Sequence, residues 1–234
     1  MSHYEKAWQA ARIRIGDAAQ AAGRPRDSVK LVAVSKTFPA DAVRSVHALG
    51  QRAFGENYVQ EAIDKQRALA DLPDIEWHLI GPLQSNKARL AAASFDWVET
   101  INRLSIAERL GAARAHERGP LNVLIQVNVS GESTKHGVAA ADVLALARDV
   151  HQVSGLTLRG IMGIPEATDE IARQRERFRA LRRCFDACRE AGLCVDTLSM
   201  GMSADLEAAI AEGATEVRVG TAIFGPRQKD SGST

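Results

Sequence analysis

The chain has 234 residues, of which 45% are hydrophobic and 25% are charged, and 30 Lys and Arg stand against 29 Asp and Glu. This composition supplies enough apolar material for a large core and excludes a wholly disordered protein. The near-zero net charge argues against a broad surface for nucleic acid or for anionic membranes.

The first predicted element is an amphipathic helix near the N-terminus. Its apolar residues are spaced by three and four: Tyr4, Trp8, Ala11, Ile15, Ala18 and Ala22. The pattern lasts less than three heptads, so we expect a helix that packs on the rest of the fold and not a coiled coil.

Eight short segments further along the chain have the composition of buried β-strands. Three are rich in β-branched residues, at 31–34, 123–129 and 217–219, and five are weaker, at 52–55, 77–80, 97–100, 157–161 and 196–199. Runs of this kind are typical of parallel strands that are covered on both faces.

Helical segments lie between the predicted strands. Phe178, Leu181, Phe185 and Cys188 share one helix face, and Gly50, Gly192 and Gly213 each suit a left-handed helix C-cap. Eight strand–helix units of about 29 residues each favour a single α/β domain over residues 1–228. We expect a (β/α)₈ barrel with an extra N-terminal helix, followed by a loose tail at 229–234. An open doubly wound sheet is the alternative.

Export and membrane signals are absent from the sequence. No apolar run has the length of a membrane span, and the first 23 residues lack the apolar centre of a signal peptide. The three cysteines, Cys184, Cys188 and Cys194, have no further ligands nearby for a metal. We therefore expect a cytoplasmic protein with reduced thiols and no metal.

Two basic residues are candidates because binding residues of a (β/α)₈ barrel follow the carboxyl ends of the strands. Lys36 ends the first predicted strand, where a desolvated amine could form a Schiff base, although a lysine that reaches solvent is the default. Arg218 alternates with two valines of the last strand. If the valines face the helices, Arg218 points into the barrel, toward an anion or toward a carboxylate such as Glu99.

Two turns near the end of the chain have features of a phosphate site. Ser203 precedes a helical segment as a natural N-cap, Gly201 permits close backbone approach, and Gly220–Thr221 forms a second turn on the adjacent strand. Each feature alone has a purely structural explanation, but their joint position favours phosphate binding.

Three further residues are weaker candidates. His78 lies within a strand, where a hydrogen-bonded core histidine is the commoner outcome. Asn57 could merely cap the helix that begins near Tyr58. Lys135 lies in a polar loop after the fifth strand, where a solvated segment is the default.

Six segments taken together resemble the pyridoxal phosphate homeostasis proteins. They are residues 32–37, 54–61, 77–87, 130–137, 199–205 and 218–225, and in this order they are spread over nearly the whole chain. The resemblance implies a barrel similar to the N-terminal domain of alanine racemase, with pyridoxal 5′-phosphate (PLP) as its cofactor. The one departure noticed is Gly163, where the family pattern leads us to expect alanine.

The resemblance also implies roles for individual residues. Lys36 would hold PLP as a Schiff base and Arg218 would face the pyridine nitrogen. The phosphate would be bound by Ser203, Gly220 and Thr221, with Met200 and Gly201 in the same loop. Asn57 and His78 would lie close to the cofactor, and Lys135 would fall in a loop associated with cofactor handling.

The implied chemistry favours binding over catalysis. An arginine beside the ring nitrogen opposes its protonation and so weakens the ring as an electron sink. Racemases with such an arginine add an acid/base residue from a C-terminal domain, and this chain ends soon after Gly225. We therefore expect a non-catalytic, monomeric protein that buffers PLP or delivers it to apo-enzymes, without nucleic acid or membrane as a partner.

Two other functions are kept as alternatives. The first is a PLP-dependent amino-acid racemase. The second is a (β/α)₈ enzyme that acts on a phosphorylated sugar or acid, with Lys36 forming the Schiff base.

Overall fold

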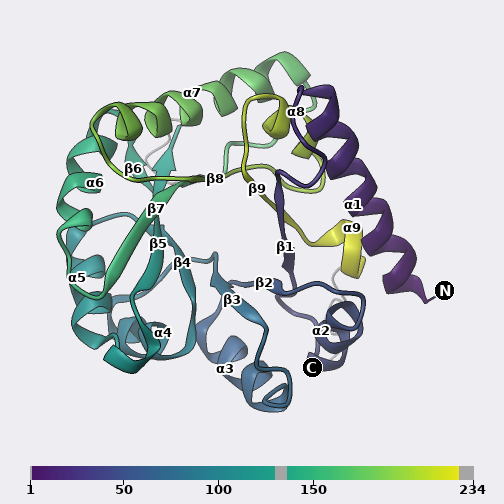
Figure 1. The fold of residues 1–234 in the computed structure, drawn as a ribbon, viewed down its shortest axis with the longest axis horizontal. Coiled ribbons are helices and arrows are strands. Elements are labelled where there is room, and N and C mark those ends of the chain that lie inside the picture. The colour runs from purple at the N-terminus through teal and green to yellow at the C-terminus, as the bar shows by residue number, and fades with distance from the viewer. Residues whose placement is uncertain (1, 130–135, 227–234) are drawn as a thin grey trace, which may run out of the picture.

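The fold is built on eight parallel strands, seen in a computed structural model that describes residues 2–129 and 136–226 (Figure 1). The strands are β1 (Lys30–Val34), β2 (Ala53–Glu56), β3 (Glu76–Leu79), β4 (Trp97–Ile101), β5 (Leu121–Asn128), β7 (Leu156–Gly163), β8 (Thr197–Ser199) and β9 (Glu216–Val219). Each of the eight predicted strands is confirmed, with ends shifted by a few residues at most.

The sheet closes into a barrel. Successive strands pair in parallel, β9 pairs with β1, and β4 pairs with β5. The predicted (β/α)₈ barrel is therefore confirmed, and an open sheet is excluded. A further strand, β6 (Val138–Ala139), extends β5 at Val127 and Asn128. Its two residues were too short a pattern to predict.

Helices surround the barrel (Figure 1). They are α1 (His3–Ala21), α2 (Ala40–His47), α3 (Val59–Ala68), α4 (Ala88–Ser94), α5 (Leu104–Ala113), α6 (Val143–His151), α7 (Ile171–Glu190), α8 (Leu206–Ala211) and α9 (Thr221–Phe224), with short 3₁₀ turns at Ser85–Lys87, His116–Arg118 and Ala140–Asp142. Gly192 and Gly213 have positive φ and directly follow the C-cap residues of α7 and α8, as predicted. Gly50 also has positive φ but lies two residues beyond Ala48, the C-cap of α2.

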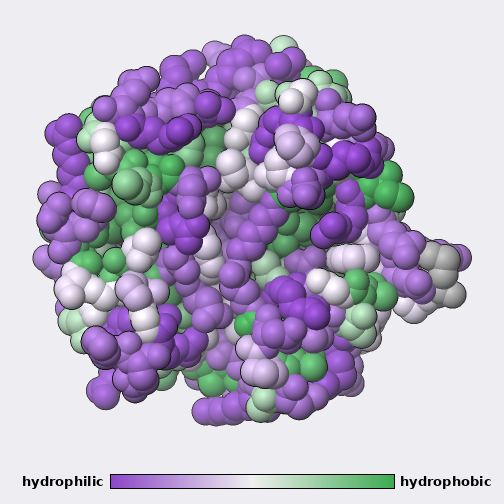
Figure 2. Space-filling model, in the orientation of Figure 1, coloured by the Kyte–Doolittle hydropathy of each residue, from purple (hydrophilic) through white to green (hydrophobic). Residues whose placement is uncertain are grey.

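The N-terminal helix packs on the barrel as expected. Helix α1 runs alongside α8 and α9 (Figure 1), and it buries Ala11, Ile15 and Ala19 against the core. Figure 2 shows the molecule in the orientation of Figure 1. The face seen there is largely hydrophilic, with apolar side chains in separate patches. Within the described part of the chain, no helix has the length and apolar character needed to span a membrane.

The barrel has two cores of different character. Leu31, Ala33, Val217 and Val219 face outward and join one large apolar cluster with the helices. Residues of the opposite parity face inward, and a small apolar group of Trp97, Leu124 and Met162 lies there. The rest of the inward-facing set includes buried polar and charged side chains, namely His78, Glu99, Ser199, Glu216 and Arg218. The interior of the barrel is therefore polar enough to support a site at its mouth.

Candidate functional site

Lys36 lies just beyond the carboxyl end of β1. Lys30, Val32 and Val34 alternate along the strand with Leu31 and Ala33, which pack against the helices. Since side chains alternate between the faces of a strand, Lys36 continues the inward series. The residue is half-buried, consistent with a position at the rim of the barrel.

The two predicted phosphate turns lie side by side next to the end of β1. Met200, Gly201 and Ser203 follow β8, and Gly220 and Thr221 follow β9. The backbone N–H of Ala222 donates to Ser203 Oγ at 3.4 Å, which joins the two turns. A Cβ on Gly220 would lie 3.2 Å from the carbonyl oxygen of Val34, so the second turn touches the strand that leads to Lys36.

One local expectation about these turns was wrong. Ser203 does not cap a helix, because α8 begins at Leu206 with Asp205 as its N-cap. The Asp205 side chain instead accepts the Met202 N–H at 2.6 Å and closes the turn that contains Ser203. Gly201 has φ 96°, and a Cβ there would lie 2.5 Å from the Cβ of Ala209. Close packing of strand against helix, as much as approach to a ligand, therefore requires this glycine.

Asn57 follows β2 on the same end of the barrel. Helix α3 begins at Val59 with Tyr58 in the cap position and no side-chain cap bond. The alternative in which Asn57 caps this helix is therefore wrong. Its half-buried side chain lines a cavity instead.

Arg218 points into the barrel, as its alternation with two valines predicted. It is 3% exposed, its Nη1 donates to Ser199 Oγ at 2.5 Å, and its Nη2 donates to the carbonyl of Gly163 at 2.9 Å. The same Nη1 lies 3.9 Å from Glu99 Oε2. Of the two partners that the sequence left open for Arg218, the carboxylate of Glu99 is present in the structure, and an anion stays a prediction.

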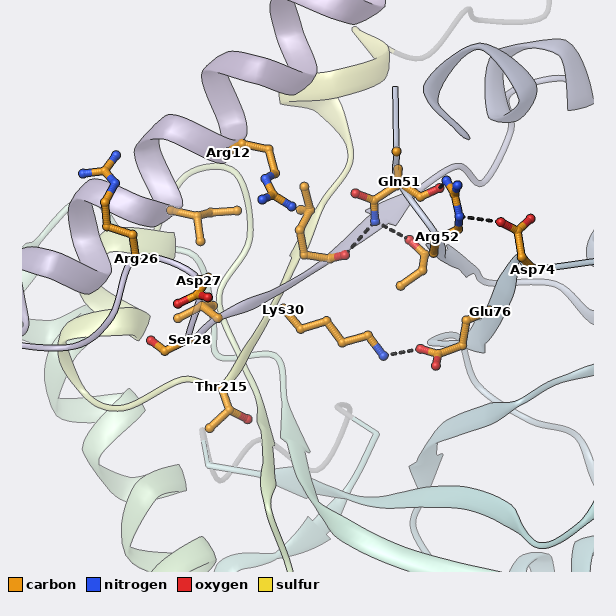
Figure 3. Close-up of a pocket in the computed structure, with 15 residues that line it drawn as sticks. Arg12, Arg26, Asp27, Ser28, Lys30, Gln51, Arg52, Asp74, Glu76 and Thr215 are labelled. Atoms are coloured by element: carbon orange, nitrogen blue, oxygen red, sulfur yellow. Dashed lines mark hydrogen bonds and ion pairs between the residues drawn. The ribbon is translucent and has the colours of Figure 1, made fainter. Parts of the chain in front are cut away.

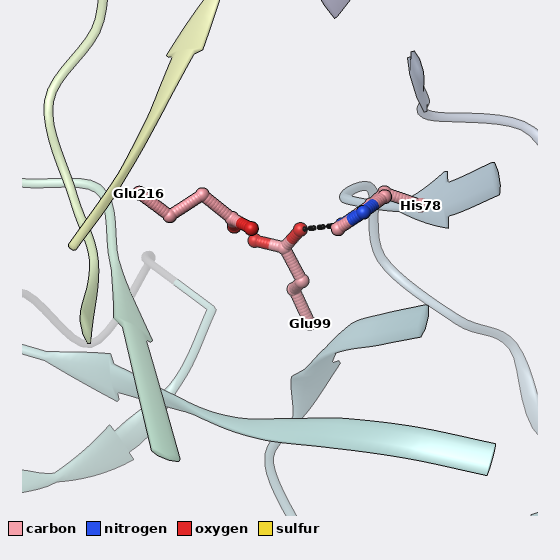
Figure 4. Close-up of side chains that lie close together, drawn as sticks. All are labelled: His78, Glu99 and Glu216. Carbon is pink, nitrogen blue, oxygen red and sulfur yellow. Dashed lines mark hydrogen bonds and ion pairs between the residues drawn. The ribbon is translucent and has the colours of Figure 1, made fainter. Parts of the chain in front are cut away.

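A chain of hydrogen bonds links Arg218 to His78. Glu99 accepts from Ser199 Oγ at 2.7 Å and contacts His78 Nδ1 at 2.7 Å (Figure 4). The other ring nitrogen, Nε2, contacts Glu76 at 2.7 Å. His78 is fully buried, so both nitrogens are already engaged, which matches the hydrogen-bonded core histidine that was the commoner expectation.

The electrostatic surroundings of His78 favour its charged form. Burial disfavours that form, but the charge of Glu216 and the hydrogen bonds with Glu76 and Glu99 outweigh it and raise the pKa of His78 to about 9. The surroundings of Glu216, in contrast, favour its neutral form. Burial and the neighbouring charge of Glu99 raise the pKa of Glu216 to about 7.

His78, Glu99 and Glu216 also have the spacing of a metal site, with ligand atoms within 4.8 Å of one another. Glu216 approaches the Glu99–His78 pair from the opposite side of the barrel (Figure 4). Five charged side chains meet here, the carboxylates of Glu76, Glu99 and Glu216 and the cations Lys30 and Arg218. One proton on His78 or Glu216 balances their charges, whereas a divalent cation would leave an excess. Shared protonation therefore explains the cluster.

Cavities lie at both ends of the barrel. One of about 610 Å³ opens where the strands begin, between α1 and β1–β3, and contains the Lys30–Glu76 ion pair (Figure 3). The other, of about 630 Å³, opens at the carboxyl ends of the strands and is lined by Asn57, Lys87, Thr100, Arg103, Gln126 and His136. Ligands of these barrels bind at the carboxyl ends of the strands, which favours the second cavity. Of the predicted site residues Asn57 lines it, whereas Lys36 and the turns after β8 and β9 do not.

The structure thus brings most of the predicted residues to one end of the barrel. Lys36, Asn57, Met200, Gly201, Ser203, Gly220 and Thr221 all follow strand ends there, with Arg218 one layer deeper. His78 is separated from this end by the Glu99–Ser199–Arg218 chain. Lys135 lies outside the described residues.

Gly163 gives a stability prediction. A Cβ there would lie 2.4 and 2.5 Å from the two terminal methyl groups of Leu181, which is fully buried. We expect Gly163→Ala to force that side chain into another rotamer and to lower the free energy of unfolding by about 1–2 kcal/mol. Urea denaturation measures the change, and a second change, Leu181→Val, should relieve most of it. A fully stable single variant would contradict this packing.

Comparison with known proteins identifies the family. A family model for the alanine racemase N-terminal domain matches residues 9–228. The pyridoxal phosphate homeostasis protein of Pseudomonas aeruginosa is 58% identical over 218 residues, which are 93% of this chain and 92% of the relative. The Escherichia coli K12 protein of the same name is 50% identical over 92% of this chain and 93% of its own length. The chain belongs to the pyridoxal phosphate homeostasis protein family.

Solved structures agree with this membership. PipY of Synechococcus elongatus PCC7942, in a structure with PLP bound, matches with a TM-score of 0.79 and 42% identity over 85% of this chain and 93% of PipY. An alanine racemase of Clostridium difficile 630 matches with a TM-score of 0.68 over 87% of this chain and 54% of the racemase, at 15% identity. This second likeness shows a shared barrel fold.

Sequence reasoning missed several polar residues inside the barrel and next to Lys36. Glu76, Ser199 and Glu216 occupy inward positions of their strands, and alternation from Arg218 and His78 would have found Glu216 and Glu76. A second set, Glu56, Glu61 and Lys65, surrounds the residues on either side of Lys36. Lys65 lies on a helix, where a solvated lysine is the usual expectation, so its burial had no signal in the sequence.

Proposed function

We propose that this protein binds PLP at the carboxyl end of its barrel and holds it through Lys36, to store the cofactor or deliver it. The observation that carries the proposal is the meeting of two turns, joined from Ala222 to Ser203, directly beside the strand that leads to Lys36. The PLP-bound structure of PipY, a relative that is 42% identical, supports it.

The residues at this end suit the parts of the cofactor. The Ser203 hydroxyl accepts the Ala222 N–H and can donate its own proton, so it would bind the phosphate with Gly220 and Thr221 beside it. Met200 and Gly201 would shape the same loop. The aldehyde of PLP supplies an electrophilic carbon that an amine can bond reversibly, releasing water, and Lys36 would provide that amine.

Arg218 would set the electronic character of the ring. A guanidinium beside the pyridine nitrogen opposes its protonation and so weakens the ring as an electron sink. Ser199 and Glu99 fix this guanidinium from below, and His78 would act through them without touching the cofactor. Asn57, which lines the cavity at the carboxyl ends of the strands, would border the ring. These features favour storage over turnover.

Absorbance spectroscopy and chemical trapping test the proposal. We expect the wild-type protein to gain a visible absorbance band with PLP and to become labelled at Lys36 after borohydride reduction, as read by peptide mapping. Lys36→Ala should lose the band and the label. Labelling at another lysine, with Lys36 unmodified, would refute the assignment.

An isotope experiment separates storage from racemisation. The PLP-loaded protein, incubated with a panel of amino acids in deuterium oxide, should leave the α-protons unexchanged in proton NMR spectra. Exchange that disappears in Lys36→Ala would show a racemase-like activity and contradict the non-catalytic role.

A further inference from the structure

The backbone on both sides of Lys36 is fixed by side chains from other elements. Ser35, directly before it, is fully buried. Thr37, directly after it, has φ 68° and is the one non-glycine residue with positive φ in residues 2–129 and 136–226. A residue with a β-branched side chain rarely adopts this conformation, so the surroundings must hold it there.

One ammonium group organises these contacts. Lys65 Nζ, from α3, donates to the Ser35 carbonyl at 2.7 Å, to Glu56 Oε1 at 2.7 Å and to Glu61 Oε1 at 2.8 Å. An ammonium has three N–H donors, so its capacity is used in full. The two carboxylates pass the restraint on to the backbone and side chains around Lys36.

Each carboxylate reaches one neighbour of Lys36. Glu56 accepts from the Ser35 hydroxyl at 2.6 Å, and Glu61 accepts from the Thr37 N–H at 2.5 Å. Ser35 is thus held through its side chain and its carbonyl, and Thr37 through its amide. We call Glu56, Glu61 and Lys65 the clamp.

Burial makes the clamp hard to explain by stability alone. The Lys65 and Glu56 side chains are 7% and 0% exposed. A buried ion pair loses so much hydration that apolar residues of similar size are often equally stabilising. Burial also raises the pKa of Glu56 to about 7, against the opposing charge of Lys65. A requirement for a fixed position of the neighbouring backbone accounts for such a group.

We propose that Glu56, Glu61 and Lys65 are positioning residues that hold the Lys36 amine in line with the aldehyde carbon of the bound cofactor. The inference rests on the proposed function. Bond formation between an amine and an aldehyde depends on their relative placement, because misplacement by about 1 Å can cost a factor of roughly 100. Binding of the phosphate on β8 and β9 does not involve the clamp.

A pair of ligands separates positioning from general binding. PLP can form the covalent bond, and pyridoxine 5′-phosphate, with an alcohol in place of the aldehyde, cannot. The ratio of their dissociation constants therefore reports how well Lys36 captures the aldehyde. In Glu61→Ala and Lys65→Met we expect the preference for PLP to fall by about 10- to 100-fold, with pyridoxine 5′-phosphate binding within about 2-fold of wild type.

Asp64→Ala is the matched control. It removes a carboxylate from the same helix, but Asp64 is 61% exposed and pairs with Arg67 on the surface. Its PLP preference should equal that of wild type. Circular dichroism and thermal melting verify folding. If Lys65→Met does not fold, Glu61→Ala decides, since Glu61 is more exposed.

Each contrary outcome has a distinct meaning. An unchanged ligand ratio in folded Glu61→Ala, or equal weakening of both ligands, would overturn the clamp's role and leave the proposed function intact. A wild-type protein that shows no preference for PLP over pyridoxine 5′-phosphate would overturn the proposed function itself, and the positioning role with it.

Discussion

Gly160→Ala is expected to lower the free energy of unfolding by roughly 4 kcal/mol, the combined effect of a strained backbone and a displaced strand. Gly160 has φ 150°, and a Cβ there would lie 1.8 Å from the carbonyl oxygen of Thr197. That oxygen belongs to the backbone of β8, which pairs with β7 at this position. No side-chain movement can relieve the contact, so the two strands would have to separate.

Chemical denaturation measures this loss, and Gly192→Ala is its matched control. Gly192 also has a positive φ, 83°, but nothing lies within 4 Å of a Cβ built on it. We expect that variant to cost only about 1 kcal/mol, the strain of a left-handed alanine. Since β8 leads directly to Met200 and Gly201, Gly160→Ala should also weaken the proposed binding of phosphate. Equal stability of the two variants would show that β7 and β8 can part without cost.

The barrel was predictable because parallel strands covered on both faces leave continuous apolar runs, and eight such runs alternate with helical patterns. Strand alternation also predicted that Arg218 points inward. The expectation that Ser203 caps a helix failed because the helix starts later: α8 begins at Leu206, and Asp205 occupies the N-cap position without a side-chain cap bond. Strand β6 is two residues long and carries no pattern.

The clamp and the buried charges could not be predicted for a different reason. Lys65 contacts Ser35, which lies 30 residues earlier in the chain, and Glu99 contacts Ser199, which lies 100 residues later. Such partners become neighbours only when the barrel closes. A lysine or glutamate in isolation predicts a solvated surface, so a buried network is invisible until the register of the strands is known.

Stability is expected to fall as pH rises from 6.5 to 9, because His78 holds a proton more tightly in the folded chain. Its pKa is raised to about 9 in the barrel, against an ordinary value near 6.5, mainly by the charge of Glu216 and by hydrogen bonds with Glu76 and Glu99 that outweigh burial. The folded state therefore binds more protons than the unfolded state in this window. The resulting stability is complete below about pH 6.5 and is lost as the pH passes 9.

The size of this loss follows from the shift, which corresponds to about 3 kcal/mol, or roughly 10 °C in melting temperature for a chain of this length. Glu216→Gln removes the largest influence that raises the pKa of His78, so its melting temperature should vary less between pH 6.5 and 9. Once that carboxylate is removed, the positive charges of Lys30 and Arg218, which face the same cluster, oppose a positive charge on His78. Glu108→Gln, which changes an exposed carboxylate on α5, is the control and should follow wild type. A slope in Glu216→Gln as steep as that of wild type would mean that some other group governs the loss, and the charge balance inside the barrel would need a different explanation.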